Sequence, residues 1–447
     1  MKEKVLVAMS GGVDSSVAAL IMKQKGYEVI GVFMKCFSDT KDPLTGECNW
    51  RSERRMAIQI ASLLDIPLHT EDYEKEYKKL VIKEMINSYK KGITPNPDVD
   101  CNNKIKFPLL WKAAKKYKCN YLVTGHYVRI LKSKNKNKSS KFVNSVLPRV
   151  GGEGGRVDDE QFRDKGVSIG KVGEIARWDN ELASDRKNQT FQLHRAKAEN
   201  KDQSYFLYRL TQNDLSHTIF PIGEFSKDEV REIARKNNFP NADKKGTSGI
   251  CFIGKINVKE YLKNKIKQKK GDILDPSGKK IGEHDGIYFY TVGERIGPRH
   301  GINFEKQEPN KQLVRRWYVA RKDTVKNILI VAPQDHPLLY RKIILVKELH
   351  LINPKEKLPK QIDVRIRHVG ELLDAEFNGL SKSDFTNSNT SLGMVGGGGG
   401  GLSKVAENNK IKITLKTPIT GISEGQAIVF YKKNSSLVLG GGVISFQ

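Results

Sequence analysis

Two cysteines and one aspartate stand in settings that favour chemistry. Residues 94–102 place two prolines within four residues ahead of Cys101, which fixes φ and predicts a stiff loop. Asp98 precedes Cys101 by three residues, a spacing that suits an acid/base group beside a nucleophile. Cys251 lies between glycines in residues 246–254. Because free cysteine is among the most buried residue types, an ordinary packing role remains the alternative for both cysteines.

A second candidate is the segment 10–16, Ser-Gly-Gly-Val-Asp-Ser-Ser, which follows an apolar strand pattern and opens a helical one. Small residues let backbone N–H groups approach a phosphate, and a helix N-terminus adds partial positive charge. Asp14 beside a phosphate requires a Mg²⁺ ion or a capping role. An ordinary capped strand-to-helix turn fits the same residues, so both interpretations stay open.

Other motif matches are weaker. The nearest match to the standard ATP-binding loop spans residues 249–255, but Ile256 stands where a Mg²⁺-binding hydroxyl is needed, so we reject it. Cys36, Cys48 and Cys119 have no setting comparable to those above. No Cys-x-x-Cys pair occurs, which argues against a zinc ribbon or an iron–sulfur cluster held by such a pair. We expect no metal site built from protein ligands.

Length and composition limit the class of protein. The 447 residues exceed one ordinary domain, and 38% hydrophobic with 29% charged residues is typical of a globular chain. Five cysteines without framework spacing indicate a reducing compartment. No apolar run is long enough to span a membrane, and the first residues have neither signal-peptide nor transit-peptide character. We expect a cytoplasmic protein, with an organelle as the alternative if a targeting segment is missing from the sequence.

The formal net charge of +27 favours a polyanionic partner, because each neutralised phosphate releases condensed counterions. The alternative is compositional drift toward Lys and Asn in loops. Charge does not identify the polyanion.

The elements that must position these residues alternate along the first third of the chain. Strands are predicted at 5–9, 29–34, 68–72 and 121–124, and helices at 14–25, 51–64, 74–90 and 105–116. Such alternation predicts a parallel sheet with helices on both faces. Ligands bind at the carboxyl ends of such strands, so the turn after residue 9 is the expected site.

Two stretches break the pattern. Residues 132–199 predict a low-complexity insertion, and residues 381–409, with six consecutive glycines, predict a flexible loop. Helices are predicted at 226–237 and 258–268. The region after residue 288 is rich in strand patterns, which favour a small barrel or sandwich. These strands are predicted at 316–320, 328–331, 342–349, 361–369, 410–415, 427–431 and 437–444.

The segment Ser-Gly-Gly-Val-Asp-Ser resembles the PP-loop of the N-type ATP pyrophosphatases, a motif shared by several ligases and RNA-modifying enzymes. In order along the chain, the motifs SGGVDSSV, GVFMK, TPNPDVDCNNKIKF, TGHYVR, KDQSYFLY, FPIGE, GTSGICFIG, EGQAIVFY and LGGGVI resemble the tRNA-specific 2-thiouridylase (MnmA) family. The resemblance covers nearly the whole chain apart from the two insertions.

The resemblance implies an enzyme that uses ATP and Mg²⁺ to adenylate the C2 oxygen of the wobble uridine of tRNA, with release of pyrophosphate. Sulfur then replaces this oxygen. The resemblance implies that Asp98 is the acid/base group, that Cys101 is the nucleophile, and that Cys251 carries a persulfide. The persulfide sulfur would come from a sulfur-relay protein or a cysteine desulfurase. Cys101 would free the terminal sulfur by forming a disulfide with Cys251.

The same resemblance implies two binding sets. The ATP contacts are Ala8, Met9, Ser10, Gly11, Gly12, Val13, Asp14, Ser15, Met34 and Gly125. The tRNA contacts are Asn96, Pro97, Asp98, His126, Lys201, Asp202, Gln203, Arg367, His368 and Gln426.

We therefore expect an α/β fold in three parts: a doubly wound parallel-sheet PP-loop domain at 1–217, a small central domain at 218–334 and a C-terminal β-barrel at 335–447. The chain departs from the family pattern at residues 246–249, Gly-Thr-Ser-Gly in place of Asp-Ser-Thr-Gly, at Lys255 in place of Glu and at His368 in place of Tyr. Both cysteines and Asp98 are kept.

Two other function classes stay open. A PP-loop ligase would need no cysteine, so unchanged activity in Cys101→Ala and Cys251→Ser would favour it. A catalytically inactive RNA-binding protein would bind tRNA without releasing pyrophosphate. The sequence specifies neither the tRNAs that are modified nor the oligomeric state.

Overall fold

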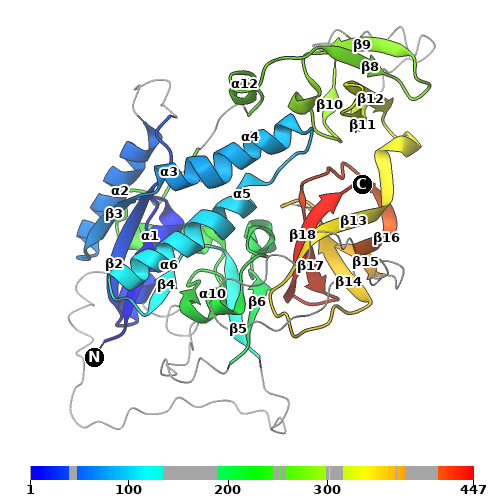
Figure 1. Ribbon diagram of the computed structural model, residues 1–447. Helices are drawn as coiled ribbons and strands as arrows, with labels where there is room; N and C mark the ends of the chain where they lie inside the picture. Colours follow the sequence, from blue (N-terminus) through cyan, green and yellow to red (C-terminus); the bar gives the residue numbers. More distant parts are fainter. Residues whose placement is uncertain are drawn as a thin grey trace, which may run out of the picture.

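The computed structural model describes residues 2–39, 48–133, 189–244, 251–253, 258–297, 302, 316–368, 370–378 and 411–446 (Figure 1). These residues form a five-stranded parallel sheet covered by helices, a five-stranded mixed sheet and a closed six-stranded barrel. Within the described ranges, no helix combines the length and the apolar character needed to cross a membrane.

The first sheet has the strand order β3-β2-β1-β4-β7, with all neighbours parallel. Its strands are β1 (Lys4–Ala8), β2 (Glu28–Lys35), β3 (Leu68–Asp72), β4 (Tyr121–Val123) and β7 (Thr218–Ile219). Successive side chains of β1 point to opposite faces, so Val5 and Val7 join one layer of the core and Leu6 joins the other. Burial on both faces explains why this strand is an unbroken apolar run.

Helices cover both faces of this sheet (Figure 1). One layer contains α1 (Val13–Gln24), α2 (Asn49–Leu63) and α11 (Lys227–Lys236). The other contains α3 (Glu74–Tyr77), η1 (Lys78–Ile82), α4 (Lys83–Lys90), α5 (Pro97–Asp100), η2 (Cys101–Lys106) and α6 (Phe107–Lys116). The segments η1 and η2 are π-helical. A wider turn therefore interrupts the continuous helix from α3 to α4 and the continuous helix from α5 to α6. The predicted doubly wound α/β domain is confirmed.

The prediction of a stiff loop over 94–102 was wrong from Pro97 onward. Pro97 occupies the first turn of α5, where a missing N–H group costs nothing. The side chain of Asn96 caps this helix by accepting a hydrogen bond of 3.3 Å from the N–H of Val99. Cys101 therefore begins a π-helical turn.

The predicted domain boundary at residue 217 was also wrong. Thr218 of β7 pairs with Leu122 of β4 in the first sheet, and α11 packs against α1. The segment that follows residue 217 therefore belongs to the first domain. A strand of two residues carries no periodicity, which is why the sequence pattern did not reveal it.

The predicted insertion at 132–199 was too long at its C-terminal end. Strand β6 (Phe191–Arg195) pairs with β5 (Val128–Lys132), and Phe191 and Leu193 are buried. Short elements connect β6 to β7: η3 (Glu199–Lys201), η4 (Ser204–Phe206) and α10 (Gln212–His217). Residues 134–188 and the insertion predicted at 381–409 lie outside the described residues.

The central domain holds a mixed sheet of order β10-β11-β12-β8-β9. The elements of this domain are α12 (Val258–Lys263), β8 (Gly271–Leu274), β9 (Lys280–His284), η5 (Ile287–Phe289), β10 (Arg295–Ile296), β11 (Trp317–Asp323), β12 (Ile328–Pro333) and η7 (Pro337–Leu339). Helix α12 is shorter than the predicted 258–268.

The C-terminal strands close into a barrel of order β13-β16-β15-β14-β17-β18, completed by antiparallel pairing of β13 with β18. The strands are β13 (Tyr340–Leu351), β14 (Gln361–Arg365), β15 (Leu373–Phe377), β16 (Ile411–Thr420), β17 (Ala427–Lys432) and β18 (Val438–Ser445). The predicted barrel is confirmed, although β15 was missed. The expected boundary after residue 334 falls between β12 and β13.

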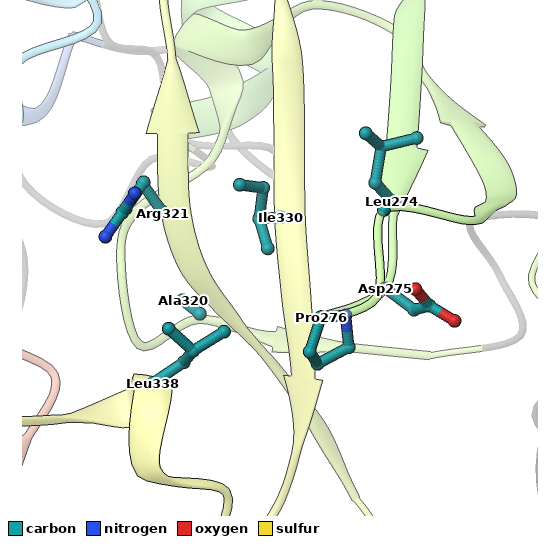
Figure 2. Close-up of a pocket in the computed structure, with 8 residues that line it drawn as sticks. Leu274, Asp275, Pro276, Ala320, Arg321, Ile330 and Leu338 are labelled. Atoms are coloured by element: carbon teal, nitrogen blue, oxygen red, sulfur yellow. The ribbon is translucent and has the colours of Figure 1, made fainter.

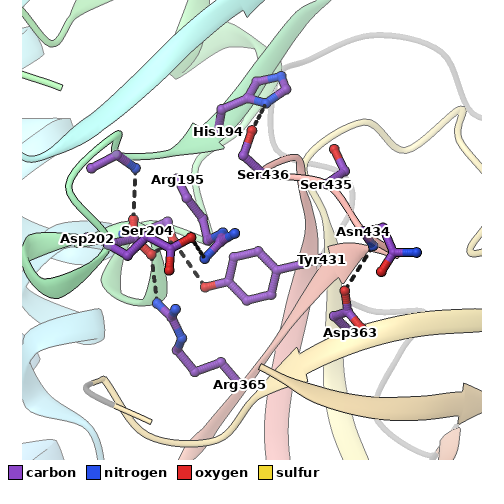
Figure 3. A network of polar contacts seen from close by, with 12 residues as sticks. His194, Arg195, Asp202, Ser204, Asp363, Arg365, Tyr431, Asn434, Ser435 and Ser436 are labelled. Carbon is purple, nitrogen blue, oxygen red and sulfur yellow. Dashed lines mark hydrogen bonds and ion pairs between the residues drawn. The ribbon is translucent and has the colours of Figure 1, made fainter. Parts of the chain in front are cut away.

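A buried polar network joins the barrel to the first domain (Figure 3). The Asp202 carboxylate is fully buried, pairs with the Arg365 guanidinium of β14 at 2.7 Å and accepts a hydrogen bond of 2.8 Å from the Ser204 hydroxyl. The Ser204 hydroxyl lies 3.0 Å from the Tyr431 hydroxyl of β17. Several hydrogen bonds therefore offset the cost of burying this ion pair.

Arg365→Met is expected to lower the free energy of unfolding by about 3–5 kcal/mol, because Asp202 would remain buried without its cation. Chemical denaturation measures this change. Lys236→Met is the control, since Lys236 pairs with Glu232 on the exposed surface and such pairs contribute about 0–1 kcal/mol. Equal stability of the two variants would contradict the role given to the network.

Candidate active site

The turn between β1 and α1 places backbone amides at the carboxyl edge of the first sheet. Gly12 is the N-cap of α1 in an extended conformation, and no side chain caps the helix. Uncapped N–H groups at a helix N-terminus are the groups that bind anions. The hydroxyls of Ser10 and Ser15 lie 3.2 Å apart at this turn. Because β1 lies between β2 and β4, the turn is at the topological switch point of the sheet.

Two glycines allow close backbone approach at this turn. A Cβ atom on Gly125 would lie 2.8 Å from the carbonyl carbon of Asp14 and 2.8 Å from the nitrogen of Ser15. Gly11 has φ +75°, and a Cβ atom there would lie 2.3 Å from the carbonyl oxygen of Glu53. The turn is therefore packed from two sides by backbone, and Gly125, a predicted ATP contact, lies beside it.

Asp14 is paired with a cation that the sequence analysis missed. Its carboxylate lies 2.6 Å from the ammonium of Lys227 and accepts a hydrogen bond of 2.7 Å from the Tyr127 hydroxyl. Lys227 is the first residue of α11, directly after the N-cap Ser226. The Ser-x-x-Glu capping box marks that helix start in the sequence, but nothing local shows that it faces the turn.

Asn241 also holds this turn and was missed. Its side-chain nitrogen donates hydrogen bonds to the Gly11 carbonyl at 3.1 Å and to the Ser16 hydroxyl at 2.9 Å. The predicted ATP residues Met9 and Met34 lie nearby at the ends of β1 and β2, and both are buried. Ala8 ends β1.

The two predicted catalytic cysteines are in contact. Cys101 begins η2 and is buried, whereas Cys251 is partly exposed, and both are free thiols. The two thiols lie close enough for each to shift the pKa of the other. The structure thus brings together residues that are far apart in the sequence.

The two thiols differ in their electrostatic environment. The hydrogen bond from Cys101 and the ammonium of Lys106 lower the pKa of Cys251 to about 7, against the effect of burial. Burial and the neighbouring Cys251 raise the pKa of Cys101 well above its ordinary value. As the pH rises, Cys251 is therefore the thiol that ionises first, near neutral pH, whereas Cys101 stays protonated.

Asp98 and Tyr77 hold the backbone of Cys251. The Asp98 carboxylate accepts a hydrogen bond of 2.8 Å from the Cys251 N–H, and the Tyr77 hydroxyl donates to the Cys251 carbonyl. Phe252 has φ +64°, an uncommon conformation for an aromatic residue. Burial raises the pKa of Asp98. Residues 246–249 and Lys255, where the chain departs from the family pattern, lie outside the described residues.

Three of the predicted tRNA residues meet at the start of α5. Asn96 and Pro97 form the N-cap and the first turn. The side-chain nitrogen of Gln426, from the barrel, donates hydrogen bonds of 2.9 Å to the carbonyls of Thr94 and Pro95. Gln426 therefore fixes the segment that leads to Asp98 and Cys101.

The remaining tRNA candidates of the first domain have mixed exposure. Lys201 is exposed, whereas Asp202 is the buried anchor of the network described above. Gln203 accepts a hydrogen bond of 2.9 Å from the N–H of Tyr127. His126 is buried, its pKa is lowered by burial, and its Nδ1 lies 2.7 Å from the Thr124 hydroxyl. The side chains of Asp202 and Gln203 are therefore already engaged in contacts within the protein.

The last two candidates belong to the barrel domain. Arg367 donates hydrogen bonds to the carbonyls of Thr420 and Gly421. The ring of His368 packs on Phe206 at 4.3 Å between centroids, and its Nδ1 is buried without a partner among the described residues.

A cavity of about 200 Å³ lies in the central domain, away from the residues above (Figure 2). Its lining is Leu274, Asp275, Pro276, Gly278, Ala320, Arg321, Ile330 and Leu338. It contains none of the predicted site residues, and we assign it no role.

Comparison with known proteins identifies each of the three parts. Residues 3–146 and 166–255 match the family described as the tRNA methyl transferase HUP domain, residues 259–333 its PRC-barrel domain, and residues 402–444 the aminomethyltransferase beta-barrel domain. These matches and the fold define a HUP-type PP-loop protein with two β domains. The alignment with a solved structure of NMN synthetase from Francisella tularensis covers 55% of this chain and 66% of that chain, with a TM-score of 0.27 and 13% sequence identity. We infer nothing from a similarity this low.

Several full-length relatives are more informative. The tRNA-specific 2-thiouridylase MnmA 1 of Geobacillus kaustophilus is 33% identical over 99% of this chain and 95% of its own length. The MnmA of Coxiella burnetii (strain Dugway 5J108-111) is 34% identical over 99% of this chain and 98% of its own length. The chain belongs to the tRNA-specific 2-thiouridylase MnmA family.

Gly125→Ala is expected to lower the free energy of unfolding by about 1–3 kcal/mol, because the new methyl group would displace backbone at the start of α1. Gly297→Ala is the control, since its added Cβ meets nothing within 4 Å. Thermal and chemical unfolding of both variants test this packing. Equal unfolding midpoints would show that the start of α1 accommodates the methyl group without loss of stability, which would contradict the expectation.

Proposed function

We propose that this chain is an ATP-dependent tRNA-uridine 2-sulfurtransferase that converts the C2 carbonyl of the wobble uridine into a thiocarbonyl. Membership of the MnmA family supports the substrate and the overall reaction. The contact between Cys101 and Cys251, directly beside Asp98, is the observation that supports the chemistry.

The residues around the turn after β1 fit the phosphates of ATP. Uncapped amides at the start of α1 and the Lys227 ammonium supply positive potential for a triphosphate and for departing pyrophosphate. Among the described residues there is no cluster of three metal-ligating side chains, so Mg²⁺ would be held chiefly by the phosphates, with Asp14 the nearest carboxylate of the turn. When bound, this ion would neutralise phosphate charge.

Adenylation makes the C2 oxygen a leaving group. The oxygen attacks the α-phosphorus, the O–Pα bond forms, the bond to the β-phosphate breaks and pyrophosphate leaves. We assign to Asp98 the uptake of the uridine N3 proton in this step, after which Asp98 releases that proton to solvent. Burial raises the pKa of Asp98, which brings its proton exchange closer to neutral pH.

Sulfur transfer then uses both cysteines. The Cys101 thiolate attacks the inner sulfur of a Cys251 persulfide, a disulfide between the two cysteines forms, and the outer sulfur leaves as hydrosulfide. Hydrosulfide attacks C2, the C2–O bond breaks, AMP departs, and the S–H proton moves to N3 to leave the thiocarbonyl. A thiol reductant reopens the disulfide for the next cycle. A preformed contact between the two thiols is the geometry that this exchange requires.

The tRNA would bind along the junction between the first domain and the barrel. Asn96, Pro97 and Gln426 lie together there, and Arg367 and His368 follow strand β14 of the same barrel. The net charge of +27 supports attraction of the RNA backbone. A flipped-out base is needed for access to Asp98 and the cysteines.

The test uses purified protein, unmodified tRNA, ATP, Mg²⁺, a small-molecule persulfide and a thiol reductant. Mass spectrometry of digested tRNA reports 2-thiouridine, and a coupled assay reports pyrophosphate. We expect Cys101→Ala and Cys251→Ala to reduce 2-thiouridine at least about 100-fold while pyrophosphate release continues, because adenylation does not use the thiols.

Cys48→Ala is the matched control, since Cys48 lies at the N-cap of α2. Unchanged thiolation in both active-site variants would remove the cysteines from the reaction. Pyrophosphate release without thiolated tRNA in the wild type would leave only the adenylating half and favour a ligase.

A further inference from the structure

We infer that Lys106 is a positioning residue that makes Cys251, and not Cys101, the cysteine that first accepts sulfur. This inference rests on the proposed function for its meaning, but its test does not depend on tRNA or ATP.

The π-helical turn η2 sets the position of Lys106. Cys101 begins this turn and Lys106 ends it, five residues later. In a π-helix, hydrogen bonds join residues i and i+5, so residues five apart lie nearer to one face than they would in an α-helix. A regular α-helix would place them about 140° apart around its axis. The wider turn therefore presents both side chains to Cys251.

Contacts place the Lys106 cation at the Cys251 sulfur. Its ammonium lies 5.7 Å from the ring centroid of Phe252, the residue after Cys251, and its positive charge lowers the pKa of the Cys251 thiol. Lys104, on the same turn, pairs instead with Asp100 at 2.9 Å. Two lysines of one turn thus have different partners.

The other ionisable groups around Cys251 come from three more elements. Asp98 of α5 opposes ionisation of the thiol. Cys36, after β2, and Tyr77 of α3 would also oppose it if charged, but burial raises the pKa of each far above neutrality. Among the residues that the structure describes, Lys106 supplies positive charge to both Asp98 and the Cys251 thiol.

The arrangement defines an order of reaction. Cys251 is partly exposed and ionised, so its thiolate attacks the outer sulfur of a donor persulfide; the new S–S bond forms, the donor S–S bond breaks, and the donor cysteine leaves as a thiolate. Cys101 stays buried and protonated during this step. The Lys106 charge also favours ionisation of Cys101, which prepares the second exchange once Cys251 has reacted.

The test is the rate of iodoacetamide alkylation at each cysteine between about pH 5 and 10, a range that brackets the Cys251 thiol. The full-length protein is digested after alkylation and analysed by mass spectrometry. We expect the wild type to alkylate Cys251 first, with a midpoint near pH 7. Lys106→Met should lower the Cys251 rate at pH 7 by about fivefold, which corresponds to an upward shift of the Cys251 midpoint by about one pH unit.

Lys106→Arg should restore most of the rate, because it keeps the charge, and Lys104→Met should match the wild type. Thermal unfolding checks that each variant is folded, and if Lys106→Met is not, Lys106→Gln takes its place. An unchanged Cys251 profile in a folded Lys106 variant, or faster alkylation of Cys101 in the wild type, would overturn the inference. The expected profiles without any 2-thiouridine in the enzymatic assay would retire the proposed function and leave this inference standing.

Discussion

The proposed sulfur chemistry depends on one contact, that between the Cys101 and Cys251 thiols. It requires a thiol and a thiolate side by side, and a thiolate next to Asp98 is stable only with a cation in reach. The π-helical turn satisfies this requirement by carrying Cys101 and Lys106 on one face. Asp98 and Tyr77 then fix the backbone of Cys251, a residue 153 positions after Asp98.

The barrel acts on this arrangement through contacts at the start of α5. Gln426 holds the carbonyls of Thr94 and Pro95, and the Asp202–Arg365 pair anchors the barrel to the first domain. The side that would receive tRNA is therefore the side that positions the helix of Asp98 and Cys101. The turn that we propose to bind phosphate is built independently, from β1, α1, Gly125 and α11. The proposed nucleotide and sulfur chemistry therefore rest on separate elements of one domain.

Regular periodicity predicted the long elements of the first domain well, because strands buried on both faces and amphipathic helices carry strong patterns. The same approach failed where the signal is short or depends on the tertiary structure. Strand β7 has two residues, and β6 follows a segment of low complexity. The two cysteines were identified from their motifs, but the partners that tune them were not. Lys106 and Tyr77 have ordinary local sequences, and only the π-helical turn and the packing of α3 bring them to Cys251.

The central claim, that Cys101 and Cys251 exchange sulfur with each other, is tested most directly in a single turnover without reductant. The protein is loaded with persulfide at Cys251, mixed with ATP, Mg²⁺ and excess tRNA, and then quenched with an alkylating agent. Mass spectrometry counts the Cys101–Cys251 disulfide and the 2-thiouridine formed. The account predicts equal amounts of the two. Formation of 2-thiouridine with both cysteines recovered as alkylated thiols would contradict it.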